Sequence, residues 1–192
     1  QYAVVESIAA PDAKIRAFDK RTGEAVWIST PGGRPYDTTY STPIVGVFKG
    51  QAAIVFGAGD GSVYALQPRT GKVIWKYDLS IRGINTTPVI SGDKVFIGHA
   101  EENISDNSKA GAVIALDGTG RGDITKVKGK TLWNTMELTV GRSAPLLWGD
   151  NLYATSDSAT ISILNAKTGK EVGKQKLGTI MFGSLVYGDG KI

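Results

Sequence analysis

Short runs of apolar and β-branched residues alternate with turns rich in glycine and aspartate along the whole chain. One such stretch runs from Asp60 to Trp75 and has the pattern of a β-hairpin closed by a turn at residues 67–71. Gly71 supplies the positive φ that such turns need, and Pro68 presets one turn dihedral. No apolar segment of useful length has the period of a helix. The pattern therefore predicts an all-β protein.

The hairpin pattern recurs with a regular period. Matching positions are separated by 48, 50 and 48 residues, at Phe18, Leu66, Leu116 and Leu164. A lead-in that ends in proline precedes the apolar run of the next unit, at residues 41–43, 86–88 and 143–145. Each unit holds four short strands. Four-stranded repeats of about 40 to 50 residues are typical of β-propellers, in which each repeat is one blade.

The predicted fold class is thus an all-β β-propeller of four-stranded antiparallel blades, with about four blades present. Residues 1–192 are predicted to form a single propeller region. Its blades span approximately residues 1–30 (incomplete), 41–80, 81–138 and 139–180, and residues 181–192 open a further blade. Two insertions lengthen the third blade, at residues 99–109 and 118–129.

Three tryptophans stand at matching positions in the last strand of a blade, at Trp27, Trp75 and Trp133. A blade this small cannot bury both faces alone and must stack between neighbours. We therefore interpret these tryptophans as structural residues that pack on the next blade and cover its turn. The glycines assigned to such turns are Gly23, Gly71 and Gly169. Gly173 takes the tryptophan position in the fourth blade, so a looser junction is expected there.

The phrase Ala-x-Asp-x-x-Thr-Gly-x-x-x-Trp at residues 17–27 resembles the repeat of the PQQ-like β-propeller family. That family includes quinoprotein alcohol dehydrogenases and the lipoprotein propeller of the bacterial outer-membrane assembly machinery. Residues 117–126 and 141–145 are similar to stretches of bacterial PQQ-binding-like propellers. The resemblance implies an eight-bladed ring, of which this chain would form about half. The alternative is a closed ring of four blades, in which residues 185–187 complete the sheet begun by residues 2–6.

The composition and net charge of the chain are consistent with a β-propeller and exclude some kinds of site. The chain has no cysteine, which excludes disulfides and thiolate metal sites. No apolar run is long enough to span a membrane, so no direct membrane insertion is expected. The formal net charge is +4, with one basic cluster at Arg121, Lys126, Lys128 and Lys130 in the second insertion. Because no aromatic residues are interleaved, we interpret this cluster as a solvated loop and expect no nucleic-acid partner.

Ligand sites in propellers usually lie in the central funnel, where the innermost strands and their preceding loops converge. The residues predicted there are Tyr40, Arg82, Asn85, Arg142 and Ser143. Two arginines and an amide facing one cavity could clamp an anion such as a quinone tricarboxylate. The favoured alternative is that these side chains hydrogen-bond the loops of adjacent blades.

The first insertion carries a cluster of hard oxygen ligands, among them Glu101, Glu102 and Asp106. Such residues could bind Ca²⁺, but their spacing fits no EF-hand-like loop, and an acidic solvated loop is the favoured interpretation. His99 is the only histidine. A lone histidine without cysteine is a poor transition-metal site, and we identify no catalytic residue.

The favoured function is a non-catalytic scaffold or protein-interaction module, placed by the resemblance in the periplasm or elsewhere outside the cytoplasm. Its partners would be other proteins bound through propeller-face loops, with the two insertions of the third blade as the recognition surface. Blades on another segment or on a second copy are a further predicted partner. No cofactor is predicted.

The alternative function is a PQQ-dependent alcohol or sugar dehydrogenase that uses PQQ with calcium and has part of its active site outside this chain. The resemblance implies that such an enzyme has an adjacent cysteine pair, and this sequence has none. A sugar-binding propeller is a third possibility, weakly supported by Tyr36, Tyr40 and Trp148.

Overall fold

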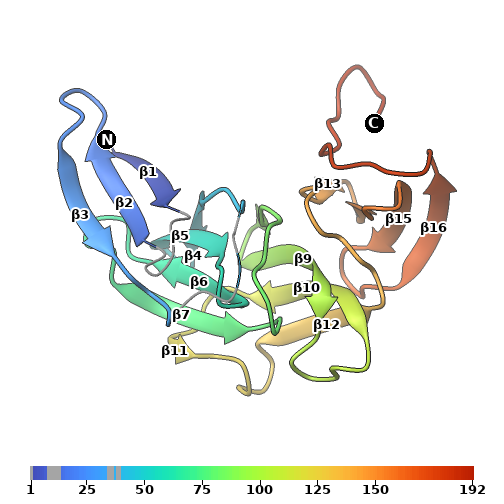
Figure 1. Ribbon diagram of the computed structural model, residues 1–192, viewed down its shortest axis with the longest axis horizontal. Helices are drawn as coiled ribbons and strands as arrows, with labels where there is room; N and C mark the ends of the chain where they lie inside the picture. The colour runs from blue at the N-terminus through green and yellow to red at the C-terminus, as the bar shows by residue number, and fades with distance from the viewer. Residues whose placement is uncertain (1, 8–13, 34–36, 38–39) are drawn as a thin grey trace.

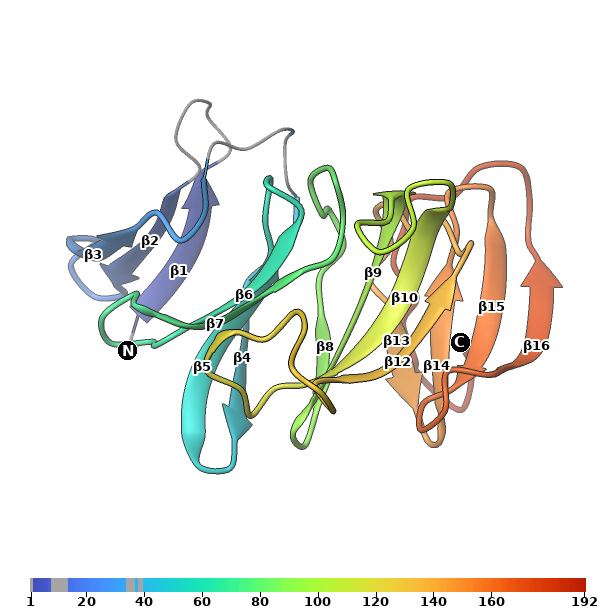
Figure 2. The ribbon, with the colours of Figure 1, turned by 90° about the horizontal axis from the view of Figure 1, so that it is seen from below.

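The computed structural model describes residues 2–7, 14–33, 37 and 40–192. These residues form sixteen strands and no helix, and the strands make four sheets that lie side by side in an open arc (Figures 1 and 2). The predicted all-β class with antiparallel four-stranded blades is confirmed. The extent of one propeller region and the number of blades in a complete ring stay predictions.

The strands of each sheet follow one another along the chain through hairpins, with one exception. The first contains β1 (Tyr2–Ser7), β2 (Lys14–Asp19) and β3 (Ala25–Ser29). The second contains β4 (Ile44–Phe48), β5 (Gln51–Gly57), β6 (Ser62–Leu66) and β7 (Val73–Asp78). The third contains β8 (Val89–Ser91), β9 (Lys94–Glu102), β10 (Ala110–Asp117) and β12 (Thr131–Met136). The fourth contains β13 (Leu146–Trp148), β14 (Asn151–Thr155), β15 (Thr160–Asn165) and β16 (Glu171–Lys176). The exception is β11 (Gly122–Asp123), between β10 and β12 in sequence, which joins the second sheet beside β7.

The two ends of the arc lie apart, with the amino terminus and the carboxyl terminus at opposite sides of Figure 1. Among the described residues, β1 pairs with β2 alone. Residues 185–187 form no strand, and the last described pairing is a bridge between Gly188 and Lys191. The four sheets therefore do not close on one another in this structure, in contrast to the four-bladed alternative.

Apolar side chains gather between neighbouring sheets. Between the first two sheets, Ile15 packs with Ile54 and Phe56 of β5. Between the second and third, Val63 and Trp75 pack with Ile114 and others, and a third cluster joins the third and fourth sheets. All five residues of β6 are buried, because a blade inside the stack is covered on both faces. The hydrophobic core is thus a row of layers between blades.

The register of the outer hairpin is the same in every sheet. In each of the first three sheets, the tryptophan of the blade's last strand pairs with an alanine of the strand before it. A β-bulge follows each of these pairs. In the fourth sheet Ile163 faces Gly173, again followed by a bulge. In this pair the large side chain, Ile163, is on the strand that carries alanine in the other sheets. An added Cβ on Gly173 would lie 3.2 Å from Cδ1 of Ile163. Gly173 is therefore the structural equivalent of the three tryptophans.

The second insertion of the third blade is not a free solvated loop, which corrects the interpretation made from the sequence. Its residues form β11 (Gly122–Asp123), which pairs in parallel with β7 of the preceding blade. The backbone N–H of Ile124 donates to the Lys76 carbonyl at 2.9 Å, and the Ile124 side chain is 1% exposed. Its basic residues Arg121, Lys126 and Lys128 stay exposed. The insertion covers an edge strand that would otherwise present unpaired backbone groups.

We expect Ile124→Val to lower the free energy of unfolding by about 0.5–1.5 kcal/mol, the usual cost of removing one buried methylene. A solvated loop would show no change. Val127→Ala is the matched control, because Val127 lies in the same insertion and is 48% exposed. Urea unfolding followed by tryptophan fluorescence measures both variants. Equal stability of the wild type and Ile124→Val would contradict the docked position of the insertion.

Candidate functional site

Three connections between strands come together on one side of the arc. The β5–β6 turn, the β7–β8 connection and the β9–β10 loop all lie on the upper side in Figure 2. The last two are joined through their backbones: the N–H of Ile81 donates to the Glu102 carbonyl at 3.0 Å, and the N–H of Ile104 donates to the Leu79 carbonyl at 3.3 Å. Ile81 and Ile104 are 40% and 49% exposed. We call this side, carrying residues 57–62, 79–88 and 102–110, the loop face.

The guanidinium of Arg82 is paired with acidic residues of the same blade. Its Nε lies 3.5 Å from Oε2 of Glu102 and 4.0 Å from Oε2 of Glu101. These are the residues that the sequence singled out as an anion-binding arginine and as metal-binding glutamates. The structure brings them together with one another, so the arginine offsets one of the two negative charges and ties the β7–β8 connection to the end of β9.

Asp106 is separate from these glutamates in its interactions. Its Oδ1 accepts hydrogen bonds from the backbone N–H and the hydroxyl of Ser108, at 3.2 and 2.6 Å, which lowers the pKa of the carboxyl. Among the described residues, no group of three or more histidine, aspartate or glutamate side chains is placed to hold a metal ion. The acidic residues of the first insertion are thus engaged in local contacts.

Asn85 and Tyr40 form a contact between successive lead-ins. The Asn85 Oδ1 accepts a hydrogen bond from the Tyr40 backbone N–H at 3.1 Å, while the Tyr40 side chain is 61% exposed. A parallel contact runs from the Thr42 N–H to the Thr87 hydroxyl at 3.0 Å, and another from the Ala144 N–H to the Ser184 hydroxyl at 2.9 Å. These bonds hold adjacent lead-ins together.

Arg142 and Ser143 lie at the lead-in of the fourth blade. The Arg142 Nη1 lies 3.3 Å from Oδ2 of Asp157, and its guanidinium carbon lies 4.5 Å from the centre of the Phe182 ring. Ser143 is fully buried, and its hydroxyl has no hydrogen-bond partner in the described part of the chain. Sequence reasoning missed Asp157, because nothing local marks an aspartate of a β-hairpin turn as the partner of an arginine fifteen residues earlier.

His99 is buried beneath the β9–β10 loop and contacts it through Asn103. Asn103 donates through Nδ2 to the carbonyls of Lys109 and Gly111, at 2.8 and 3.2 Å, so its Oδ1 is the acceptor for Nε2–H of His99 at 3.0 Å. The imidazole Nδ1 is then an unprotonated nitrogen, and it is buried without a partner among the described residues. Burial lowers the pKa of His99 to about 4, because the charged form is poorly solvated. His99 is therefore a neutral structural residue.

A quinone cofactor bound at these residues would compete with contacts made within the chain. PQQ carries three carboxylates, which need cationic or N–H donors that are free to bind them. The Arg82 and Arg142 side chains are already paired with Glu101, Glu102 and Asp157. We therefore derive no redox chemistry from this site.

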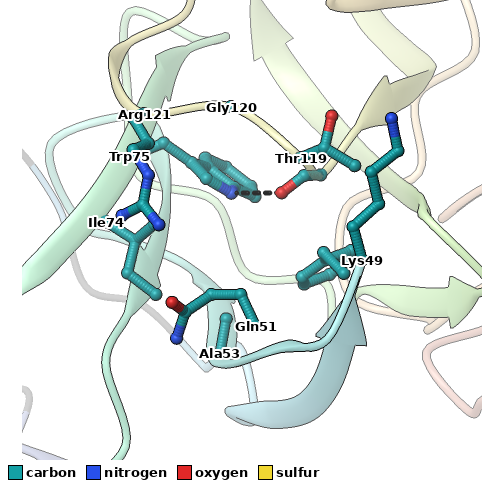
Figure 3. A pocket seen from close by; sticks show the side chains of 10 residues that line it. Lys49, Gln51, Ala53, Ile74, Trp75, Thr119, Gly120 and Arg121 are labelled. Carbon is teal, nitrogen blue, oxygen red and sulfur yellow. Dashed lines mark hydrogen bonds between the residues drawn. The ribbon is translucent and has the colours of Figure 1, made fainter.

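A small pocket lies away from the loop face, under the second insertion (Figure 3). It has a volume of about 140 Å³ and lies between the β4–β5 hairpin, β7 and residues 118–121. The indole N–H of Trp75 donates to the Gly118 carbonyl at 2.8 Å at its edge. Ligand pockets usually exceed about 300 Å³. This space is a gap in a blade junction, smaller than such pockets.

The three tryptophans lie against the turn of the following blade. Trp27 donates to the Pro68 carbonyl at 2.9 Å, and Trp133 donates to the Ala166 carbonyl at 3.1 Å. A Cβ added to Gly71 or to Gly169 would lie 2.5 Å from the ring of Trp27 or Trp133. Only glycine leaves room for the indole at these turns. Gly23 has the same turn, but no described atom lies within 4 Å of its Cβ position.

Two aromatic residues that the sequence offered as sugar ligands are placed by the structure, and Tyr36 lies outside the described residues. Trp148 stacks on Tyr187 with ring centres 3.6 Å apart, and Trp148 is 48% exposed. The indole thus has an intramolecular partner on one face. The Tyr40 backbone is bonded to Asn85 of the loop face, and the Tyr40 side chain is exposed.

No protein-family model matches the chain. The chain is 26% identical over 172 residues to the outer membrane protein assembly factor BamB of Shewanella oneidensis, covering 84% of this chain and 38% of that protein. Among solved structures, BamB from Moraxella catarrhalis matches with a TM-score of 0.56 and 20% identity over 92% of this chain and 50% of the other. A europium-containing methanol dehydrogenase matches with a TM-score of 0.64 and 18% identity over 89% and 41%.

These matches define the class of protein. The fold is a β-propeller, and the resemblance to PQQ-like propeller repeats predicted from the sequence is confirmed. Within that class, the chain is similar in sequence to an outer-membrane assembly factor and similar in fold to both the assembly factor and a methanol dehydrogenase. It spans 38% of the length of the curated relative that it matches. The described residues include no helix that could cross a membrane.

Proposed function

We propose that this chain is a non-catalytic scaffold that binds other proteins through its loop face, outside the cytoplasm and in the periplasm. The observation that carries the proposal is the pairing of Arg82 with Glu101 and Glu102 beside the exposed Ile81 and Ile104. Ion pairs and backbone bonds hold these loops in place, and apolar side chains remain on their surface. Apolar residues rimmed by charges are typical of protein–protein interaction sites.

The similarity to BamB supports the same proposal. That relative is named as an outer membrane protein assembly factor, which is an assembly role and not a catalytic one. The periplasmic location and the protein partners are carried over from it as part of the proposal. The dehydrogenase alternative rests on a likeness of fold at 18% identity. The two candidate anion-binding arginines give it no specific support, because Arg82 pairs with Glu102 and Arg142 pairs with Asp157.

The proposal predicts position-specific cross-linking. A photoreactive amino acid at Ile104, in a chain directed to the periplasm of Shewanella oneidensis, should form adducts with a small set of envelope proteins. The same group at Val127 is the matched control, since the two side chains are 49% and 48% exposed but only Ile104 lies on the loop face. Ile81→Asp should reduce the Ile104 adducts several-fold, because it places a charge in the apolar contact.

Two outcomes would contradict this function. Equal adducts from both positions would mean that the loop face has no special role. Reduction of a redox dye by alcohols or sugars, after the purified protein is incubated with PQQ and Ca²⁺, would favour the dehydrogenase. The second assay is independent of any partner, so it separates the two functions directly.

A further inference from the structure

A larger cavity lies at the junction of the third and fourth sheets. Its volume is about 410 Å³, within the range of about 300–1,000 Å³ that is usual for small-molecule sites. The β8–β9 and β13–β14 turns border it, and Figure 2 shows both turns on the lower side of the arc, opposite the loop face. We call it the junction cavity; the lining residues that matter here are Ser91, Lys94, Phe96, Leu147, Asp150 and Lys167.

The junction of the second and third sheets shows how the chain closes the same space elsewhere. The first hairpins of the two blades share one register, because Phe48 pairs with Gln51 as Ser91 pairs with Lys94. Phe48 is 3% exposed, and an added Cβ on Gly118 would lie 2.4 Å from its ring. The space left there is about 140 Å³. The junction cavity therefore occurs where an exposed serine stands in place of a buried phenyl ring.

The facing turns of the two junctions are equivalent in backbone but not in side-chain bonding. The carbonyls of Asp93 and Asp150 accept hydrogen bonds from the N–H groups of Gly118 and Ala166, each at 2.8 Å. The Asp93 carboxylate also accepts from the Lys49 backbone N–H at 2.8 Å, which ties the two turns together. No described residue bonds to the Asp150 carboxylate. The turns that border the junction cavity thus lack this tie.

Phe96 forms the apolar floor of the junction cavity. It stands where Ala53 stands in the second blade, is 1% exposed, and lies with its ring centre 5.9 Å from that of Trp133. Leu147, half-buried, lines the cavity from the fourth sheet. The large side chain of this blade is therefore farther from the turn than Phe48 is in the second blade, and the end of the junction nearest the turn stays open.

The charged side chains of the junction cavity are not paired with one another. Lys94 and Lys167 are exposed, and neither ammonium group has an ion pair or a hydrogen bond within the described part of the chain. Asp150 is the one carboxylate among the lining residues. Two lysines and one aspartate leave a net positive charge beside an apolar floor. Such a combination favours a ligand with a flat apolar body and a single negative charge.

We propose that the junction cavity binds a small aromatic carboxylate. The aromatic ring takes the place that the Phe48 ring has in the neighbouring junction and packs on Phe96, and the carboxylate accepts hydrogen bonds from the ammonium groups of Lys94 and Lys167. Asp150 repels the ligand and weakens its binding. This site is separate from the loop face and does not depend on the proposed scaffold function.

The test uses 3-phenylpropionate, titrated into the isotope-labelled chain and followed by NMR. Saturable shifts centred on Ser91, Phe96 and Lys167 are expected, with a Kd of about 1 mM or below, as for a ligand of this size. The neutral amide 3-phenylpropionamide should bind about fivefold more weakly, because it lacks the charge. Ser91→Phe should abolish the saturable shifts by filling the cavity, whereas Ser91→Ala, the matched control, should leave the affinity within about twofold.

Charge variants keep the proposal testable if Ser91→Phe does not fold. Lys94→Gln and Lys167→Gln should each weaken binding about threefold, and Asp150→Asn should strengthen it, because each changes one charge beside the carboxylate. Lys170→Gln is the matched control, since Lys170 is also exposed in the turn after β15 but does not line the cavity.

Four results would each overturn the proposal: no saturable shifts in the wild type, binding that survives in a folded Ser91→Phe variant, equal affinity for the acid and its amide, or equal effects of Lys170→Gln and Lys94→Gln. None of these measurements involves a partner protein, so their failure would leave the cross-linking test of the loop face unaffected.

Discussion

Trp75→Ala should lower the free energy of unfolding by about 3–5 kcal/mol, the largest loss expected of any single substitution in this chain's junctions. The indole is fully buried between the second and third sheets, and its N–H donates to the Gly118 carbonyl at 2.8 Å. Truncation removes a large apolar surface and leaves a cavity beside a backbone carbonyl that has lost its donor. It also removes the support under the second insertion. Urea unfolding followed by circular dichroism measures the loss.

Two variants separate the contributions of Trp75. Trp75→Phe keeps a buried ring but removes the N–H donor, and we expect a smaller loss of about 1–2 kcal/mol. Trp148→Ala is the matched tryptophan control at an exposed site, where the stacking contact with Tyr187 is worth about 0.5–1.5 kcal/mol. A loss at Trp75 no greater than that at Trp148 would mean that the junction does not carry the stability of the stack.

Acidification should destabilise the wild type through His99 by up to about 3 kcal/mol, from its pKa of about 4 in the fold against 6.5 unfolded. Because the folded pKa is lowered, the fold favours the neutral imidazole, and the unfolded chain takes up a proton first. The loss therefore begins as the pH falls below 6.5 and is complete below pH 4. The protonated ring would place a second N–H, at Nδ1, in a buried position without an acceptor among the described residues.

His99→Gln isolates this titration from that of the carboxylates. Glutamine can donate to the Asn103 Oδ1 in place of the imidazole Nε2 but does not take up a proton in this range. The stability difference between wild type and variant, measured by urea unfolding from pH 7.5 to 4, should shift in favour of the variant as the pH falls. A difference that stays constant with pH would show that His99 is not held neutral by burial.

Stability and recognition depend on different parts of the chain. The tryptophan junctions and the row of apolar layers hold the blades in order, whereas the loop face lies on two turns within blades and on the β7–β8 connection between them. Under the proposed function, a partner would contact residues such as Ile104, whose replacement should leave the core intact. Substitutions at the loop face and at the junctions are therefore expected to separate binding from folding.

The repeated pattern was sufficient to predict the architecture. Regular spacing of hairpins, turn glycines and tryptophans follows from local turn chemistry and from the need of each blade to stack, and both leave marks in the sequence. The equivalence of Gly173 with the tryptophans could also be read from the alignment of repeats, and the register of the fourth sheet agrees with it.

The tertiary structure alone decided the partners of the polar side chains and the course of the second insertion. Arg142 pairs with Asp157, and Arg82 pairs with Glu101 and Glu102. The distance between the segments that carry these residues depends on the twist and stacking of the sheets. The insertion returns to β7 because one isoleucine, Ile124, can be buried there, and a single apolar residue in a polar stretch gives no periodic signal. A fold built of repeats can be predicted from sequence because its pattern recurs. A contact that occurs once gives no such pattern, and it depends on the packing that brings its residues together.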